Sequence, residues 1–164
     1  MTTFRLIGLA LIGSALLLAR SEERLAISAL SSCGQGNPQR LGGEISVETD
    51  RMFLKNLTAG YLALLPVSHG RDPFELTPGV QGFEGMYLGV RQRFPQESIT
   101  PFVGVSMLGH LLAERPYASL NPEVGIAIKV LKQYELSAHV RYFLTSRGRD
   151  NDFLTFGLGV SRIF

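Results

Sequence analysis

Residues 134–145, YELSAHVRYFLT, alternate between two kinds of side chain. One set is largely apolar: Leu136, Ala138, Val140, Tyr142 and Leu144. The other is mostly polar or charged: Glu135, Ser137, His139, Arg141, Phe143 and Thr145. Successive side chains of a β-strand point to opposite faces, so this period of two predicts a strand with two different faces.

The same alternation extends over much of the chain. It is clear in 123–131 and 154–164, and it is compatible with 44–49, 82–93 and 100–112. Two further segments, 24–31 and 56–67, are apolar enough for strands but do not reveal their faces. The total is eight expected strands. Beyond residue 21 no stretch sustains a period of 3.6 residues, so we expect no substantial helix there.

The connections between these segments differ in length. The expected long connections are 32–43, 68–81, 113–122 and 146–152, and the short ones are 50–55, 94–99 and 132–133. Outer-membrane barrels have short periplasmic turns and longer outer loops, and each membrane-crossing strand needs roughly 9–11 residues. The pattern therefore predicts an all-β, eight-stranded antiparallel up-and-down transmembrane β-barrel. Both of its termini would be periplasmic, and its interior would be too narrow for a large pore.

The N-terminus has the features of an export signal. Arg5 precedes an apolar stretch from Leu6 to Ala19, which is shorter than the roughly 20 residues of a spanning helix. Small residues at 19 and 21 predict cleavage before Glu22, which gives a signal peptide at 1–21 and a barrel at 22–164. An uncleaved anchor is the alternative for this segment. Lipidation of Cys33, which ends a lipoprotein-like box, is disfavoured because charged residues interrupt the approach to it.

Charge and cysteine content exclude several classes of protein. Arg5 and Arg20 are two of the 16 Lys and Arg residues, so the mature part has 14 basic and 14 acidic residues. We therefore expect no nucleic-acid partner, which would require a basic stripe. Cys33 is the only cysteine, so no intramolecular disulfide forms. No metal-ligand spacing, phosphate loop or dinucleotide fingerprint is present, and we expect neither metal nor cofactor.

The polar faces of the expected strands combine glycines with charged residues. In a membrane barrel the apolar face contacts lipid and the polar face fills the interior. We expect a luminal polar network of Arg91, Glu123, Lys129, Glu135, His139 and Arg141. The chain lacks Trp, so the aromatic residues expected at the membrane interfaces are Phe102, Tyr134, Tyr142, Phe156 and Phe164.

The last residues, Gly157-Leu158-Gly159-Val160-Ser161-Arg162-Ile163-Phe164, resemble the terminal strand signature of bacterial outer-membrane proteins. Arg162 stands where that signature prefers an aromatic residue. In pattern the mature chain is similar to small barrels such as the OmpA transmembrane domain and the OmpX/Ail group. The resemblance implies an outer-membrane location. It also implies recognition of Gly159, Val160 and Phe164 by the barrel-assembly machinery, and contact with outer-membrane lipid and lipopolysaccharide.

Our functional expectation is a structural or surface-interaction role without catalysis. The enzyme alternative is a lipid A deacylase-like activity with Ser137 as nucleophile, His139 as base and Glu135 or Glu123 as the orienting group. A soluble periplasmic lipocalin-like carrier is a third alternative. A surface ligand could bind the charged residues of the outer loops, which are His69, Arg71, Asp72, Glu75, Arg147 and Arg149.

Overall fold

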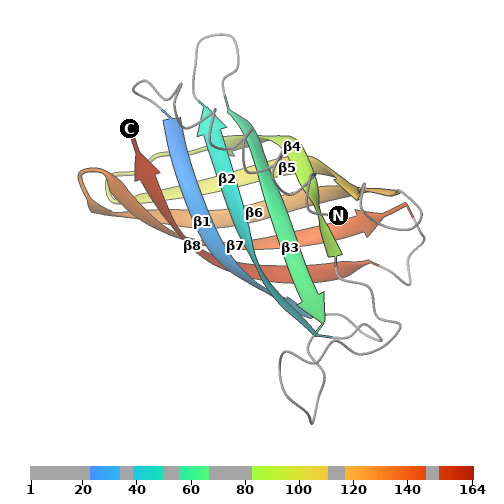
Figure 1. Cartoon of the computed structure of the whole chain (residues 1–164). Coiled ribbons are helices and arrows are strands. Elements are labelled where there is room, and N and C mark those ends of the chain that lie inside the picture. Colours follow the sequence, from blue (N-terminus) through green and yellow to red (C-terminus); the bar gives the residue numbers. More distant parts are fainter. Residues whose placement is uncertain (1–22, 34–38, 50–55, 67–82, 111–116, 147–151) are drawn as a thin grey trace.

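The structure, a computed structural model, describes residues 23–33, 39–49, 56–66, 83–110, 117–146 and 152–164. Eight strands form one closed barrel in which each strand pairs antiparallel with its neighbours in sequence (Figure 1). They are β1 (Glu23–Cys33), β2 (Arg40–Thr49), β3 (Leu57–Pro66), β4 (Phe83–Arg93), β5 (Ile99–His110), β6 (Tyr117–Leu131), β7 (Tyr134–Thr145) and β8 (Phe153–Ile163). The predicted eight-stranded up-and-down barrel is confirmed.

Pairing of β1 with β8 closes the ring. The register runs from Arg24 opposite Ile163 to Cys33 opposite Leu154, and the Phe164 N–H donates to the Glu23 carbonyl at 3.0 Å. The start of β1 therefore lies beside the end of β8, as Figure 1 shows. Closure leaves none of the eight described strands at a free edge of the sheet. Among the described residues, no helix has the length and apolar character needed to cross a membrane.

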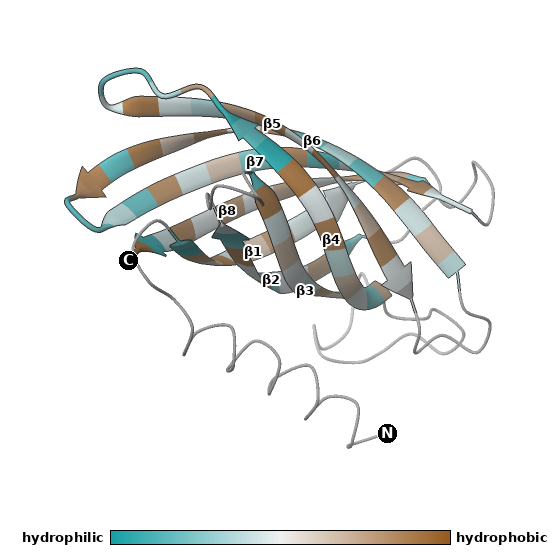
Figure 2. Ribbon diagram, turned by 90° about the horizontal axis from the view of Figure 1, so that it is seen from above, coloured by the Kyte–Doolittle hydropathy of each residue, from teal (hydrophilic) through white to brown (hydrophobic). Residues whose placement is uncertain are grey.

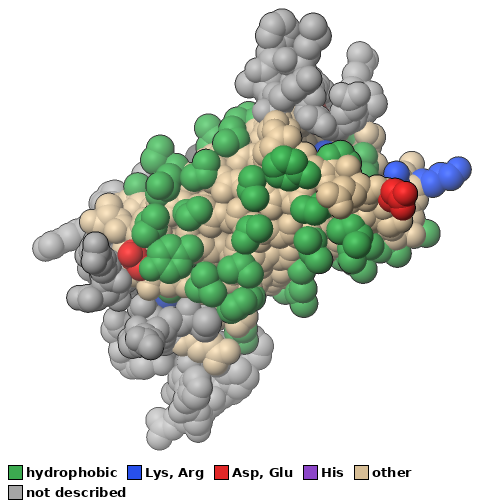
Figure 3. Space-filling model, turned by 180° about the vertical axis from the view of Figure 1, so that it is seen from behind, with side chains coloured by type: hydrophobic (Ala, Val, Ile, Leu, Met, Phe, Trp, Pro, Cys, Tyr) green, Lys and Arg blue, Asp and Glu red, His purple; other side chains and the backbone are tan. Residues whose placement is uncertain are grey.

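The two faces of each strand differ in chemistry along most of its length, and hydrophilic and hydrophobic residues alternate along the ribbons (Figure 2). On β8, for example, Phe156, Leu158 and Val160 are exposed, whereas Thr155 and Ser161 are buried. Many apolar side chains therefore lie on the outside of the barrel, as the space-filling view shows (Figure 3).

Two strands begin earlier than the sequence predicted. β2 starts at Arg40 and includes Gly42 and Gly43, and β6 starts at Tyr117 and includes Pro122. Glycine and proline normally indicate turns, but the side chain of Pro122 faces outward, and its strand pairs continuously with β5. The connections at 34–39 and 111–116 are therefore short, and the predicted strict alternation of long and short connections is wrong. The longest connection, 67–82, still lies at the end of the barrel opposite the termini.

Candidate functional site

A cluster of ion pairs occupies the middle of the barrel interior. Arg141 on β7 lies between two carboxylates: its Nη1 is 3.0 Å from Glu44 Oε2 and its Nη2 is 2.8 Å from Glu123 Oε2. Glu123 also accepts a hydrogen bond from Arg91 Nε at 2.7 Å, and the hydroxyl of Tyr87 donates to Glu44. Strands β2, β4, β6 and β7 are therefore connected across the interior by buried charge-assisted hydrogen bonds.

A second group of ion pairs lies closer to the terminal end of the barrel. Glu48 on β2 accepts two hydrogen bonds from Arg93, at 2.6 and 3.0 Å, and one from Arg91 at 3.2 Å. Arg93 also donates to Glu135 at 3.1 Å, while Arg24 lies 3.7 Å from Glu48 and 3.6 Å from Glu135. Since Arg91 contacts both Glu48 and Glu123, the two groups form one network.

The network is balanced in charge. It contains the arginines Arg24, Arg91, Arg93 and Arg141 and the glutamates Glu44, Glu48, Glu123 and Glu135. A buried ion that loses its partner is costly, whereas a paired and hydrogen-bonded ion is tolerated. The mutual pairing explains how these charged side chains occupy the barrel interior, where most of them are buried.

Aromatic rings support the arginines from the side. The guanidinium carbons of Arg91 and Arg93 lie 4.7 and 5.6 Å from the centroid of the Phe102 ring, and that of Arg141 lies 5.1 Å from the Tyr87 ring. These distances fit cation–π contacts. Phe102 is only 1% exposed, so its predicted place at a membrane interface is wrong. It lies on the inward face of β5, in register with Gly125, and fills the space beside the arginines.

Apolar side chains gather in the interior near the opposite end. Phe143 and Phe153 stack with centroids 4.8 Å apart, and Phe83 meets both edge-on at 5.0 and 4.8 Å. This apolar layer consists of Leu30, Leu62, Leu64, Phe83, Leu108, Phe143 and Phe153, with Tyr117 packed against it. Tyr87 belongs to the same cluster and connects it to the ion pairs through its hydrogen bond to Glu44. The sequence placed Phe143 on the mostly polar face, and its side chain is buried in the interior. One part of the interior holds the ion pairs, and the other holds this apolar layer together with buried polar residues such as Ser32 and Ser119.

His139 and Ser137 both face the interior from β7. His139 lies in register with Gly125 on one side and Gly157 on the other, and its Nε2 is 4.0 Å from Glu44 Oε2. Within the described part of the chain no hydrogen bond joins His139 to Ser137. Both line an interior cavity of about 10 Å³, which has room for a single water molecule and not for a lipid substrate. This cavity thus offers no room for the lipid substrate of the deacylase alternative.

Solved structures with the same fold come from bacterial outer membranes. The N-terminal β-barrel domain of Pseudomonas aeruginosa OprF superimposes with a TM-score of 0.53 and 14% identity, covering 88% of this chain and 100% of that domain. Neisserial surface protein A (NspA) gives a TM-score of 0.59 and 14% identity, covering 87% of this chain and 96% of NspA. Neither a protein-family model nor a curated protein matches the sequence. The fold is that of a small bacterial outer-membrane β-barrel.

Five of the six residues predicted for the polar network of this outer-membrane barrel fold have buried side chains: Arg91, Glu123, Glu135, His139 and Arg141. Lys129 does not join them. Its side chain is exposed, because it lies beside the tight β6–β7 turn, where a bulge between Lys129 and Leu131 shifts the register. A basic residue at that end of the strand reaches solvent without a partner inside.

Sequence reasoning missed half of the network, namely Arg24, Glu44, Glu48 and Arg93. The alternation of Ile45 and Val47 with Glu44, Ser46 and Glu48 was visible and placed both glutamates on one face. It carried no information on their partners, because Glu44 and Arg141 are 97 residues apart. Arg93 ends β4 and could equally have belonged to a turn.

The proposed assembly signal is at the closing strand of the barrel. Gly159 faces the interior, Val160 is exposed on the outside, and Phe164 is the last residue, with the Arg162 guanidinium carbon 4.9 Å from the centroid of its ring. Recognition of these residues by assembly machinery stays a prediction.

Several predictions concern residues outside those that the structure describes. These are the signal peptide at 1–21, its cleavage before Glu22, and the loop residues His69, Arg71, Asp72, Glu75, Arg147 and Arg149. In the described ranges no group of three or more His, Cys, Asp or Glu side chains could hold a metal ion.

Proposed function

We propose that this chain is an integral outer-membrane barrel with a structural or surface-interaction role and a lumen sealed by its own side chains. The observation that carries the proposal is the reversal of the usual burial pattern. Leu158 is 69% exposed and Val124 is 55% exposed, whereas Arg141 is 1% exposed. A water-soluble barrel, including a lipocalin-like carrier, would have its apolar face inside. Lipid hydrocarbon around the barrel accounts both for the exposed apolar side chains and for the buried charged ones.

The closed ring supports the same proposal. A segment in lipid must satisfy its backbone hydrogen bonds within the protein, and only helices and closed barrels do this. The sheet pairs every described strand on both sides.

The filled interior supports a sealed lumen. The ion-pair network crosses the barrel through β2, β4, β6 and β7, and the apolar layer follows it toward the other end. A solute that passed through would have to break both. Eight strands leave an interior just wide enough for side chains, in agreement with this arrangement.

Arginine substitutions at different depths test the membrane location. Val124 lies in the middle of β6 and Val130 lies near its end, and both side chains are exposed. In lipid vesicles we expect Val124→Arg to lower the free energy of unfolding by about 2–4 kcal/mol and Val130→Arg by about 0–1 kcal/mol. Denaturant titration followed by heat-modifiable gel migration measures both. Equal, negligible losses at the two depths, together with recovery of the protein in the soluble fraction, would refute the proposal.

The surface-interaction role belongs to the connections opposite the termini. Connection 67–82 is the longest in the chain, and 146–152 joins β7 to β8 at the same end. In an outer-membrane barrel with periplasmic termini this end faces outward. Replacing 68–81 or 147–151 with Gly/Ser linkers should abolish binding of whole cells to a surface ligand while heat-modifiable migration is retained. Binding that survives both replacements would assign the chain a purely structural role.

A further inference from the structure

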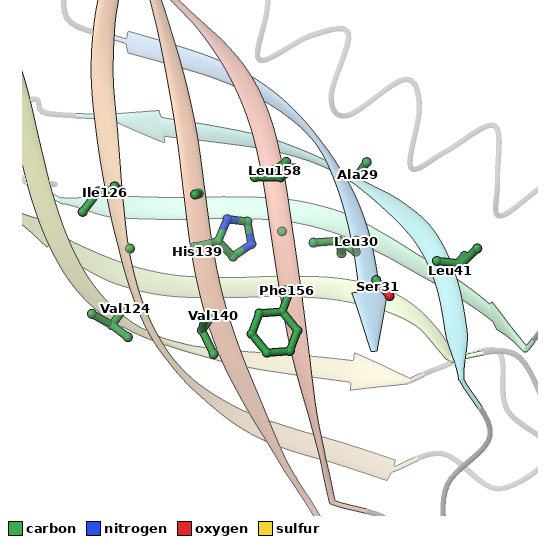
Figure 4. A pocket seen from close by; sticks show the side chains of 13 residues that line it. Ala29, Leu30, Ser31, Leu41, Val124, Ile126, His139, Val140, Phe156 and Leu158 are labelled. Atoms are coloured by element: carbon green, nitrogen blue, oxygen red, sulfur yellow. The ribbon is translucent and has the colours of Figure 1, made fainter. Parts of the chain in front are cut away.

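A groove of about 630 Å³ lies on the outer wall of the barrel and is lined by residues of β6, β7, β8, β1 and β2 (Figure 4). Small residues, Ala29 and Ser31 on β1 and Ala138 on β7, form its floor. Larger residues border it, Leu41 on β2 and Phe156 and Leu158 on β8. Apart from Ser31 and the interior residue His139, the groove is lined by glycine and apolar residues.

The strand register explains why the wall is hollow here. Ala29 lies opposite Leu158, and Leu158 lies opposite Ala138, so small and large outward side chains alternate from strand to strand. On the other side of β1, Ala29 lies opposite Gly43, which is exposed. A β-carbon at Gly43 would meet only one atom within 4 Å, the Ser28 carbonyl oxygen at 3.5 Å, so the outer surface beside Ala29 stays low on the β2 side as well. Side chains that differ this much in size leave a channel between Leu41 and Leu158.

The place of the groove on the barrel indicates what fills it. Its outward residues, which include Val124 and Ile126 on β6, belong to the exposed apolar surface that the proposed membrane location puts in contact with hydrocarbon. Leu41 is the second residue of β2 and Ser31 lies near the end of β1, so the groove extends toward the end opposite the termini. In an outer-membrane barrel with periplasmic termini that end lies in the outer leaflet, whose lipid is lipopolysaccharide.

We propose that this groove holds one acyl chain of a lipopolysaccharide molecule in a defined position on β1, β7 and β8. The inference rests on the proposed membrane location and goes beyond it, because lipid that merely surrounds a barrel has no preferred position on the wall. The burial of hydrocarbon between Leu41, Phe156 and Leu158 would retain this lipid when the rest is exchanged for detergent.

Native mass spectrometry of the barrel extracted from outer membranes in mild detergent tests the proposal. We expect the wild-type chain to carry one lipopolysaccharide adduct. Ala29→Leu with Ala138→Leu fills the groove and should lower the lipid-bound fraction about tenfold, equivalent to about 1.4 kcal/mol of binding free energy. The matched control is Ala59→Leu with Ala118→Leu, which adds the same atoms to outward positions on β3 and β6 away from the groove and should retain the adduct.

A fluorescence titration gives a second measurement that does not depend on the filled variant folding. The chain has no Trp, so Phe156→Trp places a single reporter in the groove and Leu88→Trp places one on β4. Addition of purified lipopolysaccharide to lipid-free protein refolded in detergent should shift the emission of the Phe156→Trp reporter and saturate at one lipid per barrel. The Leu88→Trp reporter should show no saturable change.

Three results would overturn the proposal. They are an equal adduct in the groove and control variants, a phospholipid adduct in place of lipopolysaccharide, and a complex of two barrels whose formation the groove substitutions abolish. Loss of the adduct from a barrel that still fractionates with outer membranes would refute the acyl-chain site alone. A barrel found in the soluble fraction would refute the membrane location as well.

Discussion

Arg141 is 1% exposed and contacts Glu44 and Glu123, which are also buried. Its removal would therefore destabilise the barrel mainly by leaving two buried carboxylates without a cation. A methionine has a similar length but no charge, so Arg141→Met would leave two carboxylates facing each other without their shared cation. The charge balance of this part of the interior therefore depends on the single residue Arg141.

We predict that Arg141→Met lowers the free energy of unfolding by about 3–5 kcal/mol, the usual cost of breaking a buried ion pair from one side. Denaturant titration in lipid vesicles measures the loss. The control is Lys132→Met in the exposed β6–β7 turn, which should change stability by less than about 0.5 kcal/mol. Similar values for the two variants would show that the interior charges are solvated or compensated by other groups.

His139 and Gly157 form a second pair at the residue scale. They are in register on β7 and β8, and a β-carbon on Gly157 would lie 2.3 Å from two ring atoms of His139 and 2.8 Å from Leu30 Cδ2. The imidazole thus occupies the space that the missing side chain leaves.

We expect Gly157→Ala to lower the free energy of unfolding by about 1–3 kcal/mol through overpacking. His139→Ala should relieve the clash, so the double variant should be more stable than the sum of the two single changes implies, with a coupling of about 0.5–3 kcal/mol. A double-mutant cycle in denaturant measures the coupling. Additive effects would mean that the ring does not fill this space.

At the scale of the strand, β2 shows how two adjacent glycines differ. Gly42 faces the interior, and its β-carbon would lie 1.8 Å from the backbone oxygen of Ala63 on β3. Gly43 faces outward into open space. A backbone atom cannot move aside as a side chain can, so the close approach of β2 and β3 depends on Gly42 and not on Gly43.

Gly42→Ala should therefore reduce the yield of folded, heat-modifiable barrel or lower the free energy of unfolding by more than about 1 kcal/mol, whereas Gly43→Ala should be neutral or stabilising by up to about 1 kcal/mol. The two variants serve as controls for each other because they share composition and strand. Equal effects would mean that the strands can separate locally to accept a methyl group.

Strand boundaries also show where reading the sequence failed. The β7 boundaries were predicted as the structure has them, because 134–145 alternates without a break. β2 and β6 were shortened because Gly42-Gly43 and Pro122 have the composition of a turn. A closed barrel accepts a glycine where a strand approaches its neighbour closely, and it accepts a proline where the ladder needs no N–H donor. Both conditions are set by the neighbouring strands and not by the local sequence.

At the scale of the whole molecule, two layers of different chemistry fill the interior in series. The ion-pair network joins strands on opposite sides of the barrel, and the apolar layer of stacked phenylalanines lies beyond it. Either layer alone would obstruct a solute. We infer that solutes do not pass through the barrel, because both layers would have to open at the same time.

We predict that vesicles containing the wild-type barrel exclude small sugars in a liposome-swelling assay, in contrast to vesicles containing a porin. Phe143→Ala with Phe153→Ala removes much of the apolar layer and should cost about 3–5 kcal/mol of stability per ring. The vesicles should still exclude sugars, because the ion-pair network remains. Sugar entry in this variant would show that the apolar layer is the only barrier.

The sequence by itself determined the number of strands, their order and the face on which most side chains lie, because the period of two is a local property of an extended chain. The sequence also placed Glu44 and Glu48 on the opposite face of their strand from Ile45 and Val47. Only the tertiary structure decided that Glu44 meets Arg141, that Phe83, Phe143 and Phe153 stack in the interior, and that small outward residues of β1 and β7 align into a groove. Those relations depend on ring closure and on the register between strands, which bring together residues that no local pattern connects.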